Sequence, residues 1–178
     1  LVRSPLDMQV VGRTLDDAAG EAFDKGAKVL GLPYPGGPLV DRNARSGDAL
    51  RFALPKPAIE GLDLSFSGIK TAFVALVNRE ELRQPGFKET ERADLCASLQ
   101  HAIIDHLMAK LRRAIRELGV NQVGIAGGVA ANSGLRLRLA ELGRREGVDV
   151  IEPPMPHFSC PACYACRCRS WRRMPGYW

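Results

Sequence analysis

Three of the four acidic side chains in residues 16–24 have the types and the spacing that a polar ligand site needs. On a helix, Asp17, Glu21 and Asp24 would share one stripe that lies roughly 100–160° away from Phe23. Carboxylates grouped in this way can accept hydrogen bonds from ribose hydroxyls, bind an amine or hold a metal ion. The same stripe also fits a solvated acidic face near the start of a helix, where negative charge is favourable, and both interpretations stay open.

A second candidate site is the glycine pair in the segment Y-P-G-G-P at residues 34–38. Gly36 and Gly37 have no side chain that would keep a ligand away from their backbone N–H groups, and the flanking prolines restrict the backbone path. The segment therefore predicts a place where the main chain approaches a ligand closely. An ordinary rigid turn has the same composition, so that alternative also stays open.

A third candidate is the segment A-G-G-V-A-A-N-S at residues 126–133. Gly127 and Gly128 follow a predicted strand and open a predicted helix, so free N–H groups and a helix dipole would favour a phosphate or carboxylate there. Asn132 adds an amide that can bind a sugar hydroxyl or a carbonyl. The segment is neither a dinucleotide-binding glycine motif nor a Walker loop, and its glycines also suit tight packing between a strand and a helix.

The other reactive side chains before residue 153 give little support for different chemistry. His101 and His106 are five residues apart on one predicted helix and do not share a face as two metal ligands would, so a metallopeptidase site is not predicted. Lys70 has the type to approach an anion, although an exposed lysine is the commoner case. Cys96 is expected to be a small core residue.

Residues 153–178 differ in composition from the rest of the chain. They contain four of the five cysteines, both tryptophans, four arginines and no acidic residue. The four thiols, at positions 160, 163, 166 and 168, could bind zinc or an iron–sulfur cluster, but structural zinc sites usually divide their ligands into two separated pairs. Because the formal net charge of +5 depends on these arginines, overall charge is weak support for nucleic-acid binding.

The elements that must position the candidate residues follow from the periodicity of the apolar side chains. Leucine and isoleucine recur at spacings of four and three through residues 93–118, which predicts one long amphipathic helix that ends at Gly119. Residues 120–126 and 148–151 are predicted strands that flank a helix ending near residue 146. This βαβ unit predicts the α/β class. The other expected elements are a strand at 8–13, helices at 14–30, 38–44 and 69–78, an extended segment at 50–64 and an exposed polar segment at 79–90.

The composition of the 178 residues, 46% apolar and 25% charged, is typical of a soluble globular protein. No apolar run is long enough to cross a bilayer, and the first residues lack the pattern of a secretory signal, so neither a membrane protein nor a secreted protein is predicted. A single cysteine before residue 153 predicts a reducing, cytoplasmic compartment.

Four segments, taken in order, resemble one protein family. They are T-x-D-D-A-A-G-E-A-F-D-K at 14–25, Y-P-G-G-P at 34–38, S-F-S-G-I-K-T at 65–71 and A-G-G-V-A-A-N-S at 126–133. This order resembles the tRNA N6-adenosine threonylcarbamoyltransferases, also called tRNA threonylcarbamoyladenosine synthases and formerly O-sialoglycoprotein endopeptidases. The resemblance covers about residues 8–152, and four motifs in one order make chance agreement improbable.

The resemblance implies an actin-like, sugar-kinase-like α/β fold, here the carboxyl-terminal lobe in incomplete form. It implies transfer of a threonylcarbamoyl group from threonylcarbamoyl-adenylate to the adenosine beside the anticodon of a tRNA. The implied partners are tRNA, the adenylate and other subunits of a tRNA-modifying complex, with no membrane. The implied cofactor is one iron, or another divalent metal, per full-length subunit. The positions that match the family's substrate contacts are Asp24, Gly37 and Asn132, and the residues adjacent to them are Asp17, Glu21, Gly36, Gly127 and Gly128.

Two parts of the family pattern are missing from the sequence. The family's metal is held by a paired-histidine motif that lies upstream of Leu1 and by an aspartate in a C-T-D-N-A-A segment, whereas Cys160 is followed here by P-A-C. We therefore expect a carboxyl-terminal family domain at residues 1–152 with no metal ligand and no catalytic residue, inactive by itself. We expect residues 153–178 to be an atypical tail, read out of frame after about Cys160. The alternative is a binding module or non-catalytic partner subunit whose cysteine-rich tail contacts metal or RNA.

Overall fold

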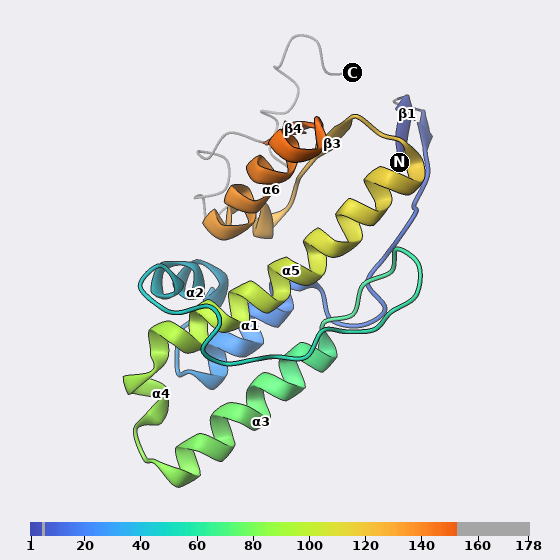
Figure 1. The fold of residues 1–178 in the computed structure, drawn as a ribbon. Helices are drawn as coiled ribbons and strands as arrows, with labels where there is room; N and C mark the ends of the chain where they lie inside the picture. The colour runs from blue at the N-terminus through green and yellow to red at the C-terminus, as the bar shows by residue number, and fades with distance from the viewer. Residues whose placement is uncertain (5, 153–178) are drawn as a thin grey trace.

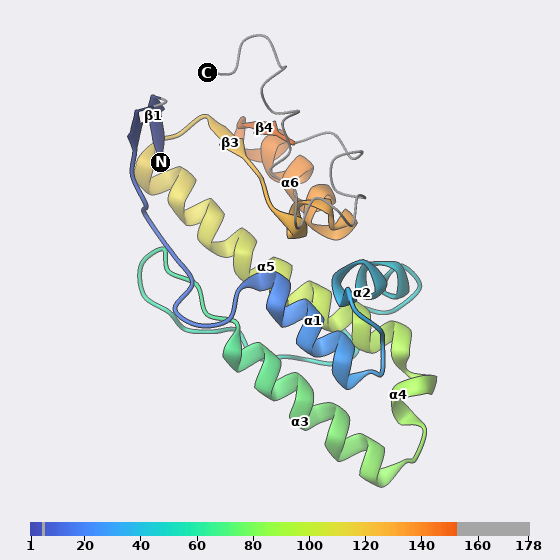
Figure 2. The same cartoon turned by 180° about the vertical axis from the view of Figure 1, so that it is seen from behind.

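The computed structural model describes residues 1–4 and 6–152, which Figure 1 and Figure 2 show from opposite sides. The predicted α/β class is confirmed, with long helices and two small sheets. In chain order the elements are β1 (Val2–Ser4), β2 (Asp7–Met8), α1 (Ala19–Val29), α2 (Gly36–Ala44), α3 (Ser67–Arg83), α4 (Phe87–Thr90), α5 (Arg92–Leu118), β3 (Gln122–Gly124), the 3-10 helix η1 (Gly128–Ala131), α6 (Ser133–Glu146) and β4 (Asp149–Ile151).

Helix α5 connects the two halves of the fold. Its bounds agree with the predicted range of 93–118 to within one residue. Helices α1, α2, α3 and α4 contact it around its first half, while α6 packs beside its second half (Figure 1). It ends at Gly119, whose φ of 61° lies in the left-handed region that glycine adopts without strain.

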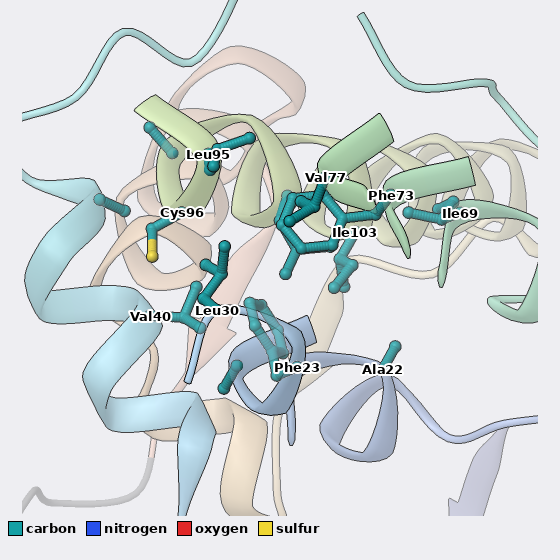
Figure 3. Packing of buried hydrophobic residues seen from close by; sticks show 14 of the residues in the cluster. Ala22, Phe23, Leu30, Val40, Ile69, Phe73, Val77, Leu95, Cys96 and Ile103 are labelled. Atoms are coloured by element: carbon teal, nitrogen blue, oxygen red, sulfur yellow. The ribbon is translucent and has the colours of Figure 1, made fainter. Parts of the chain in front are cut away.

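The larger buried cluster joins α1, α2, α3 and α5. Phe23 of α1, Val40 of α2, Phe73 of α3 and Ile103 of α5 come from four elements into one apolar interior, and none is more than 2% exposed (Figure 3). Burying one side chain of this size stabilises the fold by about 1.5–3 kcal/mol. Cys96 is fully buried in the same cluster, as expected for a core residue.

A second buried cluster lies between the predicted βαβ unit and α5. Strands β3 and β4 are parallel, with Val123 opposite Val150. Parallel strands need a crossover connection, and α6 supplies it. Leu139 of α6 is 1% exposed and belongs to one apolar cluster with Met108 of α5.

The amino-terminal elements differ from the prediction. The strand expected at 8–13 is absent, apart from its first residue, because β1 and β2 pair as a short antiparallel hairpin instead. The helix expected from residue 14 begins at Ala19. Before it, the Thr14 hydroxyl donates to the Asp17 carbonyl at 2.8 Å, and Thr14 forms a parallel bridge to Leu64. These contacts hold the segment outside the helix.

Other boundaries differ by less. Residues 50–64 are irregular, as expected, but α3 runs past the expected 69–78 to Arg83. The segment 79–90 is not wholly exposed, because Phe87 is 9% exposed and packs edge-on against Phe52 with ring centroids 5.7 Å apart. The glycine pair does not open α6 directly, because Gly128 is the first residue of η1, which precedes α6.

Replacing Ile103 with alanine is expected to lower the free energy of unfolding by about 2–5 kcal/mol, because the change removes buried methyl groups and leaves a cavity. Leu82→Ala is the control, since Leu82 is 87% exposed, and its effect should stay within about 0.5 kcal/mol. Urea denaturation of the three proteins provides the measurement. Equal destabilisation by both changes would contradict the assignment of Ile103 to the core.

Candidate functional site

Asp24 of α1 holds the start of α2. Its Oδ1 atom accepts hydrogen bonds from the backbone N–H groups of Gly36, at 2.8 Å, and Gly37, at 3.3 Å. Pro35, the residue before the helix, forms no side-chain cap, so a carboxylate from a neighbouring helix satisfies these N–H groups. Two of the predicted site residues, Asp24 and Gly37, are therefore in direct contact.

Close packing accounts for the glycine at residue 36. A Cβ atom on Gly36 would overlap the Cβ of Ala27 and would lie 3.1 Å from the Cα of Asp24. Helices α1 and α2 thus approach each other at a distance that suits only glycine. This close approach brings the N–H groups of α2 to Asp24.

A shallow depression lies beside this contact. Its volume is about 370 Å³ and it is lined by Asp24, Lys25, Lys28, Leu32, Pro33, Tyr34 and Gly36. The Tyr34 side chain is 75% exposed. Among the described residues, Oδ2 of Asp24 has no hydrogen-bond partner, so this oxygen remains able to accept a bond from a ligand.

The acidic stripe differs from the prediction because Asp17 precedes α1 rather than lying on it. Its two oxygens bind the ammonium groups of Lys25 and Lys70, each at 2.7 Å, and these hydrogen bonds lower the pKa of Asp17. Glu21 also binds Lys25, at 2.7 Å, and hydrogen bonds to Asp17 and Glu21 raise the pKa of Lys25. Asp17 and Glu21 are therefore neutralised by lysines, while Asp24 faces the start of α2.

Asn132 caps α6. Its Oδ1 atom accepts a hydrogen bond from the N–H group of Leu135 at 2.9 Å, and its Nδ2 atom donates to Oε1 of Gln100 in α5 at 2.7 Å. The residue is 8% exposed. The amide thus stabilises the helix start and retains one N–H group with no hydrogen-bond partner among the described residues.

Gly127 and Gly128 lie beside open space. A Cβ atom on either would meet no atom within 4 Å, and the φ of 90° at Gly127 favours glycine. The next residue, Val129, lies near α1, because a Cβ on Gly20 would be 3.5 Å from its Cγ2 atom. Gly20 is one helical turn before Asp24, so Val129 and Asp24 lie on the same side of α1.

Asp41 of α2 connects that helix to the start of α6. Its Oδ1 atom accepts hydrogen bonds from the N–H group of Ser133 at 3.2 Å and from its hydroxyl at 2.7 Å. The structure thereby brings the glycine-led helix α2 next to the helix that Asn132 caps. Sequence reasoning misses Asp41, because its partner is 92 residues away in the chain.

Asp16 is a second acidic residue that sequence reasoning misses. It accepts hydrogen bonds from the hydroxyls of Ser65 and Ser67 and from the N–H groups of Phe66 and Ser67 at the start of α3. Burial opposes ionisation, but these hydrogen bonds outweigh it and hold the pKa of Asp16 well below its usual range. The sequence gives little signal for this contact, because the serine hydroxyls of the S-F-S-G segment can both donate and accept hydrogen bonds and Asp16 lies about fifty residues earlier in the chain.

His106 and Cys96 are buried and have structural roles. The Nε2 atom of His106 accepts a hydrogen bond from the N–H group of Ser65 at 3.4 Å. Burial lowers the pKa of His106, and Lys110 lowers it further, against the opposing charges of Asp16 and Asp105. Burial raises the pKa of the Cys96 thiol to about 11, so this thiol is not a nucleophile at neutral pH.

A metal centre does not fit the described residues. Within 1–4 and 6–152, no group of three or more histidine, cysteine, aspartate or glutamate side chains is placed to hold a metal ion. The cysteine cluster at positions 160–168 lies outside the described residues. In the same described part, no helix has both the length and the apolar character needed to cross a bilayer.

Comparison with known proteins matches the sequence to one family. The family profile described as tRNA N6-adenosine threonylcarbamoyltransferase matches residues 1–160. The chain belongs to this family. Proteins named tRNA N6-adenosine threonylcarbamoyltransferase from Christiangramia forsetii and Porphyromonas gingivalis are both 54% identical to this family member, over 82% and 86% of its length, and one from Cytophaga hutchinsonii is 52% identical over 86%.

The matched part makes up 43% of the Christiangramia forsetii protein and 45% of each of the other two. This family member therefore spans less than half the length of those relatives. The name of the relatives denotes an acyltransferase that acts on tRNA.

In this threonylcarbamoyltransferase family member, Gly36→Ala should destabilise the fold by about 1–3 kcal/mol, because the new methyl group overlaps Ala27. Gly68→Ala is the matched control. A Cβ at Gly68, in α3, meets nothing within 4 Å, so the change should stabilise the protein by up to about 1 kcal/mol. Thermal unfolding of both variants measures the difference, and an unaltered or raised midpoint for Gly36→Ala would refute the packing argument.

The free energy of unfolding should decrease as the pH falls from about 7 to 5. Unfolded His106 takes up a proton near pH 6.5, whereas the folded pKa is lower, so the unfolded state binds more protons in this window. The loss is at most about 1.4 kcal/mol per pH unit. His106→Gln keeps an acceptor for the Ser65 N–H group and removes the titration, so denaturant unfolding at pH 7, 6 and 5 should show a smaller slope. An identical slope in both proteins would contradict the prediction.

Proposed function

We propose that this chain binds the donor and the acceptor of a threonylcarbamoyl transfer to tRNA. The donor is threonylcarbamoyl-adenylate and the acceptor is the adenosine beside the anticodon. Family membership and the names of relatives at about half identity support the reaction class. The described residues supply binding and orientation rather than a nucleophile.

The observation that carries the proposal is that the two oxygens of the Asp24 carboxylate differ in their hydrogen bonding. Oδ1 is engaged by the N–H groups of α2, which fixes the orientation of the side chain. Oδ2 has no partner among the described residues, and Asp24 lines the depression. A fixed carboxylate with one available oxygen is a suitable acceptor for the hydroxyls of a ribose.

The surroundings of Asp24 suit the other parts of an adenylate. The exposed ring of Tyr34 offers a surface for a base, and Lys28, which has no ion pair among the described residues, offers positive charge for the phosphate. Gly37, one residue past the buried Gly36, leaves the main chain unobstructed. These groups complement the ribose, base and phosphate of one ligand.

Asn132 and the glycines before it are proposed to face the threonylcarbamoyl group. The remaining N–H group of the Asn132 amide is a donor for a carbonyl oxygen. A Cβ atom on Gly127 or Gly128 would meet no atom within 4 Å, and the next residue, Val129, lies near Gly20 of α1. Asp17 and Glu21 contribute indirectly, since their lysine partner Lys25 also lines the depression.

The proposal extends to the setting in which the chain acts. It comprises an actin-like arrangement of the lobe and association with other subunits of a tRNA-modifying complex, both of which the family resemblance implies. It also comprises a cytoplasmic location, which the single cysteine before residue 153 predicts. The implied divalent metal has no ligand set among the described residues. No step of the proposal depends on it.

Asp24→Asn should weaken binding of a non-hydrolysable threonylcarbamoyl-adenylate analogue by about 10- to 100-fold, because a hydrogen bond to a charged acceptor contributes about 1.5–3 kcal/mol. The asparagine Oδ1 can still accept the N–H groups of Gly36 and Gly37, so thermal stability should change little. Isothermal titration calorimetry with AMP and with the analogue gives both affinities.

Glu89→Gln is the control, because Glu89 is exposed on α4, and its affinity should equal that of the unaltered chain. If Asp24→Asn binds the analogue as tightly as the unaltered chain does, Asp24 is not the ribose contact.

A further inference from the structure

A group of arginines lies where α5 and α6 end. The final turns of α5 contain Arg112, Arg113 and Arg116, and the last turn of α6 contains Arg144 and Arg145. We call these five residues the terminal arginine cluster. None of them belongs to the site around Asp24.

Two ion pairs show that the ends of the two helices lie together. Asp105 binds Arg138 at 3.0 Å, and Arg116 binds Glu146 at 3.1 Å. The second pair lies farther along both helices, so α5 and α6 run in the same direction. In Figure 1 both helices run toward the end of the molecule that carries β1, β3 and β4.

The arginines of α5 share one side of the helix. Arg112, Arg113 and Arg116 fall within an arc of roughly 100°, beside the apolar stripe that packs on α6. With Ala109 and Glu117 they line an open hollow of about 400 Å³. Guanidinium groups around an open hollow can reach an extended anionic ligand.

The terminal arginine cluster carries more positive charge than its ion-pair partners and the helix dipoles balance. Arg113 pairs with Glu117, and Arg116 pairs with Glu146. Among the described residues, Arg112, Arg144 and Arg145 form no ion pair; the Nε atom of Arg112 donates only to the carbonyl of Met108, at 3.4 Å. A helix carboxyl end carries roughly half a negative charge, so two ends attract about one positive charge. Arg112, Arg144 and Arg145 carry three positive charges, which is more than the two helix ends can balance.

We infer that the terminal arginine cluster is a contact surface for the phosphate backbone of tRNA. The inference rests on the proposed function, which makes tRNA a substrate, and it adds a surface remote from Asp24. Guanidinium groups bind phosphate oxygens through paired N–H donors, and successive phosphates of a folded RNA can engage several arginines at once. Such contacts position an RNA without reading its sequence.

The test compares two double variants of the full chain that lose the same amount of charge. Arg112→Gln/Arg145→Gln removes two unpaired cations of the cluster. Arg79→Gln/Arg83→Gln removes two cations of α3, where both pair with Glu80 and are 58% and 68% exposed. Binding of a fluorescently labelled tRNA is measured by anisotropy between 0.05 and 0.5 M salt, about the range in which phosphate contacts dominate. All proteins carry the same residues 153–178, so the tail cannot cause a difference.

The cluster variant should lose about two units in the slope of log Kd against log salt, and near 0.1 M salt it should bind about 10- to 100-fold more weakly. The α3 variant should resemble the unaltered chain. The inference would be overturned if both variants bound tRNA equally weakly, or if the cluster variant bound tRNA as tightly as the unaltered chain. Failure of the unaltered chain to bind tRNA would overturn it too.

Competition identifies the kind of partner. Unlabelled tRNA should displace the labelled tRNA, and poly-glutamate at the same charge concentration should not. Effective displacement by poly-glutamate would mean that the cluster suits an acidic polypeptide, against the inference. Binding of the adenylate analogue in the Asp24 experiment reports separately on the proposed function.

Discussion

The backbone N–H groups at the start of a helix need acceptors, and the origin of those acceptors determines much of this structure. None of α1, α2 and α3 receives a side-chain cap from the residue that precedes it. Asp24 of α1 supplies the acceptor for α2, and Asp16, ahead of α1, supplies it for α3. A buried donor without an acceptor costs about 1–3 kcal/mol, so each helix start is stable only when its neighbour is in place. Helix formation and tertiary packing are therefore coupled at these two points.

The candidate site is built on the same contacts. Asp24 and Asn132 each use part of a polar side chain to hold a helix start and keep another part available. The fold thus fixes the position of these groups before any ligand arrives, which lowers the cost of ordering them on binding. A substitution at either residue must be judged for both roles, because loss of the acceptor would displace a helix as well as a ligand contact.

The sequence predicts the long helix and the βαβ unit well because their signal is local. Apolar residues at spacings of three and four reveal α5 without knowledge of its neighbours, and glycine marks its end. The start of α1 was not predictable in this way, since Thr14 and Asp16 are held outside the helix by Leu64 and Ser65, about fifty residues away. For the same reason the motifs identified Asp24, Gly37 and Asn132 as candidates but could not show that Asp24 contacts Gly37, or that Asn132 binds Gln100.

Helix α5 has 27 residues, a rod of about 40 Å, and both apolar interiors are built against it. Unfolding of either apolar cluster would expose one apolar side of α5 to solvent. Local melting should therefore be confined to the periphery, such as the β1–β2 hairpin and the loop at 50–64. Amide protons along the whole rod would then exchange with solvent only when the entire domain opens, as one cooperative unit.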